Sequence, residues 1–314
     1  MAQSVAGGGG VGAIDLRGTP SRRRRERRMK AVFFSAAFLC IVLSIAIVGS
    51  LAGGAVQFLS NVEFGTLWSS GWFPRRNLFD LKTLVAGTIM VSVIAMIVAT
   101  PVGLGAAIYL SEYASPRRRR LLKPILETLA SVPSVVMAFF ALRFISPEIV
   151  QRFFGSDVPL FNITAAGLAV GLLVTPLVAS VAEDAMHAVP NALREASAGI
   201  GARKRTTSIR VVFPAAVSGI SAALILGISR AIGETMIVAI VAGGTGGSLF
   251  SLDPLKGGQT MTAAITSLAT GSDQVRGTGP AYYSLFFVGL LLFLFTLALN
   301  LLSERFVRRV RTRY

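Results

Sequence analysis

The chain has 314 residues, of which 53% are hydrophobic and only 15% are charged. This composition leaves too little polar surface to cover a globule of that size, so it excludes an ordinary water-soluble protein and indicates a membrane protein. The formal net charge of +16 could suggest a nucleic-acid partner, but the basic residues are confined to the joints between apolar runs. That pattern is typical of membrane topology.

Residues 1–30 precede the first apolar run. The first twenty are Gly-rich and have no hydrophobic period, and the basic RRRRERRMK follows. We predict a disordered, Gly-rich and basic cytoplasmic tail. The basic stretch also resembles the start of a signal peptide, with LAGGA at 51–55 as a possible cleavage site. A signal peptide has an apolar core of about 7 to 15 residues, whereas this run continues over 31–53, which favours an uncleaved helix.

Six apolar runs are long enough to cross a bilayer, because a spanning helix needs about 20 residues. They are 31–53, 83–110, 124–146, 163–189, 215–242 and 281–302. Pro101, Pro133 and Pro176 fall inside three of these predicted spans, where tolerated kinks are favoured over a gating hinge. We therefore predict an all-α integral membrane protein with one domain of six transmembrane helices over 31–303.

The basic residues predict the orientation of this domain. With the N-terminus inside, the inner segments hold 23 of the 31 Lys and Arg residues and the outer segments hold six, while Arg143 and Arg230 lie within spans. Since inner loops carry the excess of positive charge, both termini are predicted to be cytoplasmic. Residues 304–314 would then form a short basic C-terminal tail.

The longest inner loop, 190–214, is too polar to lie in lipid, and a proline marks each of its ends. Within it, LREASAG suits a short helix lying across the cytoplasmic face. Composition alone leaves two interpretations, an ordinary loop with a basic patch or a surface that a partner protein could bind. The basic residues Arg203, Lys204 and Arg205 could contact such a partner or anionic lipid, and lipid is favoured.

The same loop resembles the EAA loop of ABC importer permeases. Glu195, Ala196 and Ser197 are followed by Gly201 and then by Pro214 at the spacing of that motif, with Ser197 in place of the usual second alanine. In that family the short helix docks on a separate ATP-hydrolysing subunit, so the resemblance implies a coupling role. It also implies that Glu195 anchors the loop by polar contacts and that Gly201 permits a turn.

The chain itself lacks the motif that ATP binding needs. A phosphate-cradling P-loop requires G-x-x-x-x-G-K-[ST], and no Gly-Lys pair occurs in the sequence. The glycine-rich GGTGG at 243–247 falls at the predicted outer end of the fifth span and favours a flexible turn. We expect a transport subunit that is not an enzyme, with ATP hydrolysis on separate partners.

Arg230 and Glu234 lie in the middle of the fifth predicted span, in SRAIGETMIV. Arg230 is about 24 Å along a helix from Pro214 and about 18 Å from Ala242, too deep to reach water easily. A charged residue at such depth costs at least about 2.5 to 3.5 kcal/mol on insertion scales, so it normally faces a bundle interior or an aqueous path. Glu234, one turn further on, is expected to share its helical face and neutralise it.

The pair could simply hold helices together, but its chemistry favours a substrate site. The arginine fork suits a tetrahedral oxyanion, and Glu234 could compete for Arg230 when the anion is absent. Thr235 adds a hydroxyl beside them. We therefore expect the substrate pathway to pass Arg230, Glu234 and Thr235, with no catalytic residue.

Glu183, Asp184 and His187 come close together in VAEDAMH at the inner end of the fourth span. Their spacing could suit a metal ion or a general base. Because His187 is the only histidine and the single cysteine, Cys40, lies in the first span, the sequence favours polar residues at a membrane surface. We expect no metal site and no cofactor bound by this chain.

Longer stretches resemble the membrane permease subunits of bacterial phosphate ABC importers. RAIGETMIVAIVAGG is similar to the fifth-span signature of that family, and PVGLGAAIYLSEYASPRRR and SVPSVVMAFFAL agree with it. The resemblance covers nearly everything from about 30 to 310. It implies that the family's intramembrane charged pair falls on Arg230 and Glu234, and its coupling glutamate on Glu195.

The resemblance also implies a complex in the cytoplasmic (inner) membrane. Its other members would be a PstA-like sister permease, two PstB-like subunits that bind ATP and Mg inside, and a PstS-like phosphate-binding protein outside. With membrane lipid around it and no nucleic acid, this multi-pass chain would translocate inorganic phosphate by alternating access. Alternatives are a permease for sulfate or molybdate, an ATP-independent anion channel or secondary transporter, and a membrane scaffold. The EAA-like loop favours the importer, because a channel has no need of it.

Overall fold

The computed structural model describes residues 20–244, 246–270 and 279–311. Most of these residues are helical. The helices are α1 (Pro20–Ser60), α2 (Leu81–Ile108), α3 (Pro116–Ala130), α4 (Ser134–Phe140), α5 (Arg152–Phe154), α6 (Ile163–His187), α7 (Asn191–Gly199), α8 (Lys204–Thr207), α9 (Phe213–Ala215), α10 (Val217–Gly233), α11 (Met236–Val241), α12 (Met261–Ala269) and α13 (Pro280–Arg311). The strands are β1 (Gly71–Phe73), β2 (Leu78–Phe79) and β3 (Ser248–Leu249). Short 3-10 segments cover Phe64–Trp68 and Pro74–Arg76, and π-helical segments cover Tyr109–Tyr113, Ala141–Gln151 and Ser208–Val212.

The chain divides into two units, Met1–Ser50 and Leu51–Tyr314. The described part of the first unit belongs to α1, which begins at Pro20. The predicted disordered tail is therefore too long, since residues 20–30 are helical and residues 1–19 lie outside the described residues. Arginine and lysine favour helix, which lets the apolar helix extend into the basic stretch. At the other end, α13 continues to Arg311, so most of the predicted basic tail is helical as well.

Five helical stretches are long and apolar enough to cross a membrane, or up to six if one bent pair counts as a single span. The five are Arg24–Ser60, Leu81–Tyr113, Ser134–Phe154, Ile163–His187 and Pro280–Leu302. The bent pair, Lys204–Ala215 and Val217–Gly233, meets at an angle of 72°. A largely helical membrane protein is confirmed, with five or six spans in the described part of the chain.

The third predicted span, 124–146, has the wrong boundaries. The structure places a separate helix, α3, before a turn at Ser131, and the apolar helix then begins at Ser134. Pro133 stands at the N-cap of α4, so it breaks the chain between two helices and is no internal kink. A proline disfavours helical geometry in the residue before it, which explains a boundary at this position.

The fifth predicted span, 215–242, is not one helix. α10 ends at Gly233, Glu234 is extended with φ −67° and ψ 129°, and α11 begins at Met236. A span that is broken in the middle leaves backbone groups unsatisfied, so such breaks persist only where protein or water satisfies them. This break forms the centre of the candidate site.

The segments 61–80 and 243–279, which join spans at the end of the bundle away from α7, contain more secondary structure than the sequence predicted. β1 pairs antiparallel with β2 and β3, and Trp72 stands opposite both Phe79 and Ser248. The stretch between the fifth and sixth predicted spans also contains α12. Met261 and Ala264 of α12 are buried against the rest of the protein. All-α is therefore correct for the membrane part but omits this small sheet.

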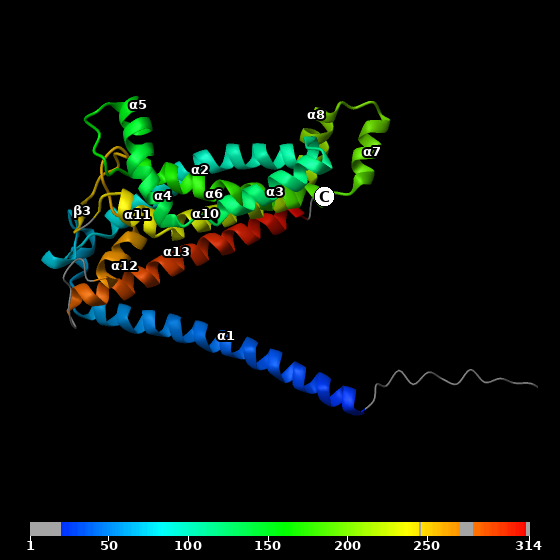
Figure 1. Ribbon diagram of the computed structural model, residues 1–314. Coiled ribbons are helices and arrows are strands. Elements are labelled where there is room, and N and C mark those ends of the chain that lie inside the picture. The colour runs from blue at the N-terminus through cyan, green and yellow to red at the C-terminus, as the bar shows by residue number, and fades with distance from the viewer. Residues whose placement is uncertain (1–19, 245, 271–278, 312–314) are drawn as a thin grey trace, which may run out of the picture. The chain divides into compact units, whose positions relative to one another are not determined.

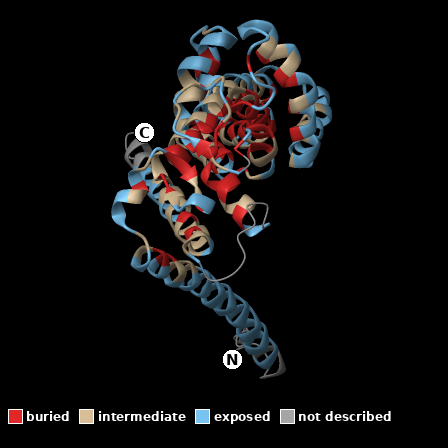
Figure 2. Cartoon of the chain, turned by 90° about the vertical axis from the view of Figure 1, so that its left-hand side faces the viewer, coloured by how far each residue is buried: buried red, intermediate tan, exposed pale blue. Residues whose placement is uncertain are grey.

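The bundle of the second unit is built around α2, α6 and α10, which pack against one another. α13 lies against α10, and α3 lies against α6. Small residues make the close approach possible: a Cβ at Gly171 of α6 would meet the Ala95 carbonyl of α2 at 2.8 Å. Buried residues gather between these helices, as Figure 2 shows. In Figure 1, α7 and α8 lie at one end of the bundle and α11 with β3 at the other.

Candidate functional site

A cavity of about 390 Å³ opens at the break between α10 and α11. Its walls come from the end of α10, the start of α11 and the first residue of α4. The lining residues are Ser134, Ser229, Arg230, Gly233, Glu234, Thr235 and Met236. All three predicted pathway residues therefore line one cavity, and two breaks in helical structure meet there.

Glu234 forms the break with its side chain. Its Oε1 accepts hydrogen bonds from the backbone N–H of Met236 at 3.2 Å and of Ile237 at 3.4 Å, which supplies acceptors for the first turn of α11. Its carbonyl accepts the Thr262 hydroxyl of α12 at 2.8 Å. The residue is 8% exposed, so these contacts hold a nearly buried carboxylate in place.

Arg230 is exposed in the single chain, without partner subunits, and it lines the same cavity. Within the described residues it makes no hydrogen bond and no ion pair. The expected neutralising contact with Glu234 on one helical face is therefore wrong, because the helix ends at Gly233 and the one-turn spacing no longer applies. The guanidinium is left with all its donors directed to ligand, water or another subunit.

Three residues with hydroxyl groups line the cavity together with Arg230. Thr235 donates its hydroxyl to the Gly233 carbonyl at 3.2 Å, and Ser229 donates to Asn300 Oδ1 of α13 at 2.8 Å. Ser134 joins from α4, about a hundred residues earlier in the chain. Neither serine was predicted from the sequence. Ser229 adjoins Arg230 and could have been found there, whereas nothing local to Ser134 points to Arg230.

The Arg230 guanidinium and the Ser134 hydroxyl have no acceptor among the described residues, so both can donate hydrogen bonds to a tetrahedral oxyanion, whereas the hydroxyls of Ser229 and Thr235 already donate to protein oxygens. The described residues hold no group of three or more His, Cys, Asp or Glu side chains that could hold a metal ion. The cavity lining thus combines the donors of Arg230 with the carboxylate of Glu234.

The predicted coupling loop lies at the other end of α10. α7 provides the short helix, and Gly201 follows with φ +77°, a left-handed conformation that favours glycine. Glu195 and Ala196 are exposed on α7. Pro214 lies in α9, just before the bend into α10. Beyond that bend, α10 carries the chain from Val217 to Arg230, about 20 Å along the helix.

Glu195 does not anchor the loop within this chain, since it has no hydrogen bond or ion pair among the described residues. The neighbouring residue Arg194 anchors the loop instead. Arg194 Nη2 donates to Glu112 Oε1 at 2.8 Å, and the Ser197 hydroxyl lies 2.8 Å from that of Thr207. Arg194 was not singled out from the sequence, where it counted only as one more basic residue.

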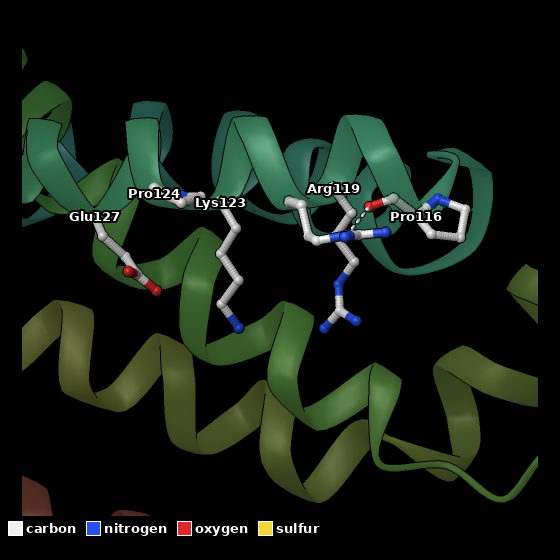
Figure 3. A pocket seen from close by; sticks show the side chains of 6 residues that line it. Pro116, Arg119, Lys123, Pro124 and Glu127 are labelled. Atoms are coloured by element: carbon white, nitrogen blue, oxygen red, sulfur yellow. Dashed lines mark hydrogen bonds between the residues drawn. The ribbon is translucent and has the colours of Figure 1, made fainter.

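A second group of charges joins α3 to α6. Arg119 and Lys123 point from α3 towards α6, as Figure 3 shows, and both form ion pairs with the fully buried Glu183 at 2.5 and 2.8 Å. Lys123 also pairs with Asp184, and Arg119 Nη1 lies 3.0 Å from His187 Nε2. The acid and histidine cluster of α6 is thus occupied by basic side chains.

These contacts set the charge of Lys123. Burial lowers the pKa of this lysine, but hydrogen bonds to Asp184 and Glu183 and their charges outweigh it, so the pKa lies above its usual 10.5. The ammonium group therefore stays charged at neutral pH. An open pocket of about 470 Å³ runs along the same face of α3 (Figure 3). Because acidic residues balance its lysine and arginines, this pocket offers little net attraction for an anion.

The fold and the cavity are those of a transport subunit. The chain belongs to the family of binding-protein-dependent transport system inner membrane components, whose family model matches residues 99–312. This membership agrees with the apolar helices and makes the chain a multi-pass inner membrane protein.

Two of the relatives are named phosphate transport permeases, and a third is named a probable ABC transporter permease. The phosphate transport system permease protein PstC of Mesorhizobium japonicum is 30% identical and covers 92% of this chain and 93% of its own length. PstC of Pasteurella multocida is 28% identical and covers 88% and 89%. The probable ABC transporter permease protein YqgH of Bacillus subtilis is 29% identical and covers 91% and 93%.

Solved structures show the same fold at low identity. A bacterial ABC transporter for import of the acidic polysaccharide alginate matches 92% of this chain and 99% of its own, with a TM-score of 0.61 and 14% identity. The MetNI methionine ABC transporter in an inward-facing conformation matches 73% and 93%, with a TM-score of 0.53 and 18% identity. At such identities the likeness concerns the fold alone.

Proposed function

We propose that this chain is the PstC-type permease subunit of an ATP-driven importer that moves inorganic phosphate across the inner membrane by alternating access. The observation that carries the proposal is Arg230, whose guanidinium lines a cavity at a broken span and has no hydrogen bond or ion pair within the described residues. The names of the relatives in Mesorhizobium and Pasteurella support phosphate as the anion.

Glu234 supports phosphate over sulfate or molybdate. Its Oε1 accepts two backbone N–H groups, while its second carboxylate oxygen has no hydrogen bond among the described residues. That oxygen can accept a hydrogen bond from a protonated oxygen of phosphate, whereas sulfate at neutral pH has no proton to donate. The Arg230 fork and this acceptor together match a partly protonated tetrahedral anion.

The partners follow from the same proposal. The exposed face of α7, with Glu195, Ala196 and Ile200, suits docking on PstB-like subunits, which bind ATP and Mg. A PstA-like sister permease would complete the pathway, and a PstS-like protein would deliver phosphate from outside. The chain itself binds no cofactor and catalyses no reaction.

The orientation belongs to the proposal as well. The segments predicted to lie inside hold 23 of the 31 basic residues, and such segments lie on the cytoplasmic side of membrane proteins. Both termini are then cytoplasmic, and β1, β2, β3 and α12 lie outside.

The test is phosphate uptake into vesicles that contain the complete complex. Wild-type complex should accumulate phosphate only with ATP, and Arg230→Gln should lower the uptake rate at least tenfold, because glutamine keeps polar donors but has neither the charge nor the fork. The matched control is Arg143→Gln, an exposed arginine outside the cavity, which should leave uptake unchanged. Wild-type uptake by Arg230→Gln would refute the site, and uptake without any ATPase subunit would favour a channel or secondary transporter.

A further inference from the structure

Arg194 joins three elements at the end of the bundle that carries α7. From α7, its guanidinium donates to Glu112 Oε1 in the π-helical end of α2, at 2.8 Å. It also donates to the carbonyl of Met186 at 2.8 Å and to that of Val189 at 2.6 Å, at and just beyond the end of α6. A single side chain therefore fixes α7 to the ends of α2 and α6.

This contact is shielded from water. The Glu112 side chain is 5% exposed and the Arg194 side chain 20% exposed. Separating such a pair would leave a buried carboxylate without its counter-charge and two helix-end carbonyls without a donor. α7 and the two spans are therefore expected to move together.

The remaining face of α7 is open. Glu195 and Ala196 are exposed beside Arg194 in the sequence, and Ile200 is 87% exposed. Because successive helical residues point in different directions, neighbouring positions serve different partners. Arg194 faces this chain, and Glu195 is free to face another.

The packing continues from α6 to the cavity. A Cβ at Gly219 of α10 would meet Ala185 of α6 at 2.4 Å, and one at Gly227 would meet Val178 at 2.8 Å. α10 thus lies directly on α6 and ends at the cavity that Arg230 lines. Close-packed helices shift as units because their interface cannot deform continuously.

We propose that Arg194 is a positioning residue that passes a movement of α7 to α2 and α6, and through α6 to α10 and the cavity. This inference rests on the proposed function, because it takes the movement of α7 to come from an ATPase subunit docked there. Arg194 touches neither substrate nor nucleotide. Its loss should separate ATP hydrolysis from transport while leaving docking intact.

The experiment compares variants of the complete complex in vesicles, with phosphate transported per ATP hydrolysed as the readout. Arg194→Ala should still co-purify with the ATPase subunit and hydrolyse ATP, but the ratio should fall at least tenfold. Glu195→Arg should instead reduce co-purification, because it reverses a charge on the open face. Arg194→Lys should recover part of the ratio, since one ammonium group cannot replace all the donors of a guanidinium.

Glu112→Gln separates transmission from docking. Glu112 is nearly buried outside α7, so its substitution leaves the surface of α7 unchanged. The ratio should fall here too, by a smaller factor, because glutamine keeps one acceptor oxygen. Arg210→Ala removes an exposed arginine with no contact among the described residues and should behave as wild type.

The outcomes decide between the two proposals. Absence of ATP-driven uptake by the wild-type complex would refute the proposed function itself. An unchanged ratio in Glu112→Gln would overturn the inference, even if Arg194→Ala lowered the ratio or failed to assemble. The inference would be supported if the ratio of phosphate transported to ATP hydrolysed fell in Glu112→Gln, which still co-purified normally, and stayed unchanged in Arg210→Ala.

Discussion

Glu234 holds the break in the fifth span with its side chain and its main chain. The carboxylate caps α11, and the carbonyl accepts the hydroxyl of Thr262 in α12. One carboxylate oxygen remains for the cavity. The side chain caps α11, and in the proposed function it also contacts the substrate. Two substitutions can separate these two roles.

Glu234→Ala removes both parts, whereas Glu234→Gln keeps an oxygen that can cap the helix. We expect Glu234→Ala to destabilise the protein by about 1 kcal/mol, the usual effect of losing a cap, and to lower phosphate uptake. Glu234→Gln should keep its thermal stability in detergent but lower uptake about tenfold, because it lacks the charged acceptor. Equal uptake by Glu234→Gln and wild type would show that the side chain of Glu234 acts only as a helix cap.

At the scale of single residues the sequence grouped Arg230, Glu234 and Thr235, which line one cavity, but it did not predict their contacts. The depth of Arg230 in an apolar run was enough to predict a polar site, because burial of a charge is costly wherever it occurs. The ion pair with Glu234 failed because it assumed an unbroken helix. Glycine before Glu234 and threonine after it were a signal for a break, whereas Ser134 reaches the cavity through tertiary packing that no local pattern records.

α10 owes its position to its small residues. At Gly227 the side chains of Val178 and Val174 of α6 lie where a Cβ would come within 2.8 and 3.3 Å. Valine is stiff at χ1, so these side chains cannot turn away easily. A larger residue at 227 must therefore push α10 off α6.

Gly227→Leu tests this contact. Overpacking a close interface costs about 1 to 3 kcal/mol, so the variant should melt at a lower temperature in detergent and transport less phosphate. The matched control is Gly105→Leu in α2, where nothing lies within 4 Å of the added Cβ. Because leucine favours helix over glycine by up to about 1 kcal/mol, the control should be at least as stable as wild type. Equal melting of the two variants would contradict the packing argument.

Elements followed from the sequence where length and apolarity were sufficient. Apolar runs located α2 and α6, and the start of α13, within a few residues, since only helices satisfy their backbone groups in lipid. α12 was missed because it has nine residues in a Gly, Ser and Thr-rich stretch, and its burial comes from neighbours far along the chain. The division of α3 from α4 was missed although Pro133 marked it.

Over the whole second unit, the cavity and α7 lie at opposite ends of α10, and α6 runs between them. A substrate site separated from a partner-binding loop needs rigid elements between them, because coupling between distant sites is carried by packed side chains and ion pairs. In the proposed coupling, Arg194 would transmit a movement of α7 to the spans at one end, and Glu234 would respond to it at the cavity at the other end. Such coupling requires the two ends of α10 to face opposite sides of the membrane.

Single-cysteine labelling can test that orientation. In a Cys40→Ser background, Arg205→Cys in α8 and Leu252→Cys between β3 and α12 each place one thiol at an exposed position. Because basic loops remain inside, a membrane-impermeant maleimide added to intact cells should label Leu252→Cys and leave Arg205→Cys unlabelled until the membrane is opened. The Cys40→Ser background alone should stay unlabelled in both conditions. Labelling of Arg205→Cys in intact cells would invert the topology, which would place α7 beyond the reach of any cytoplasmic ATPase.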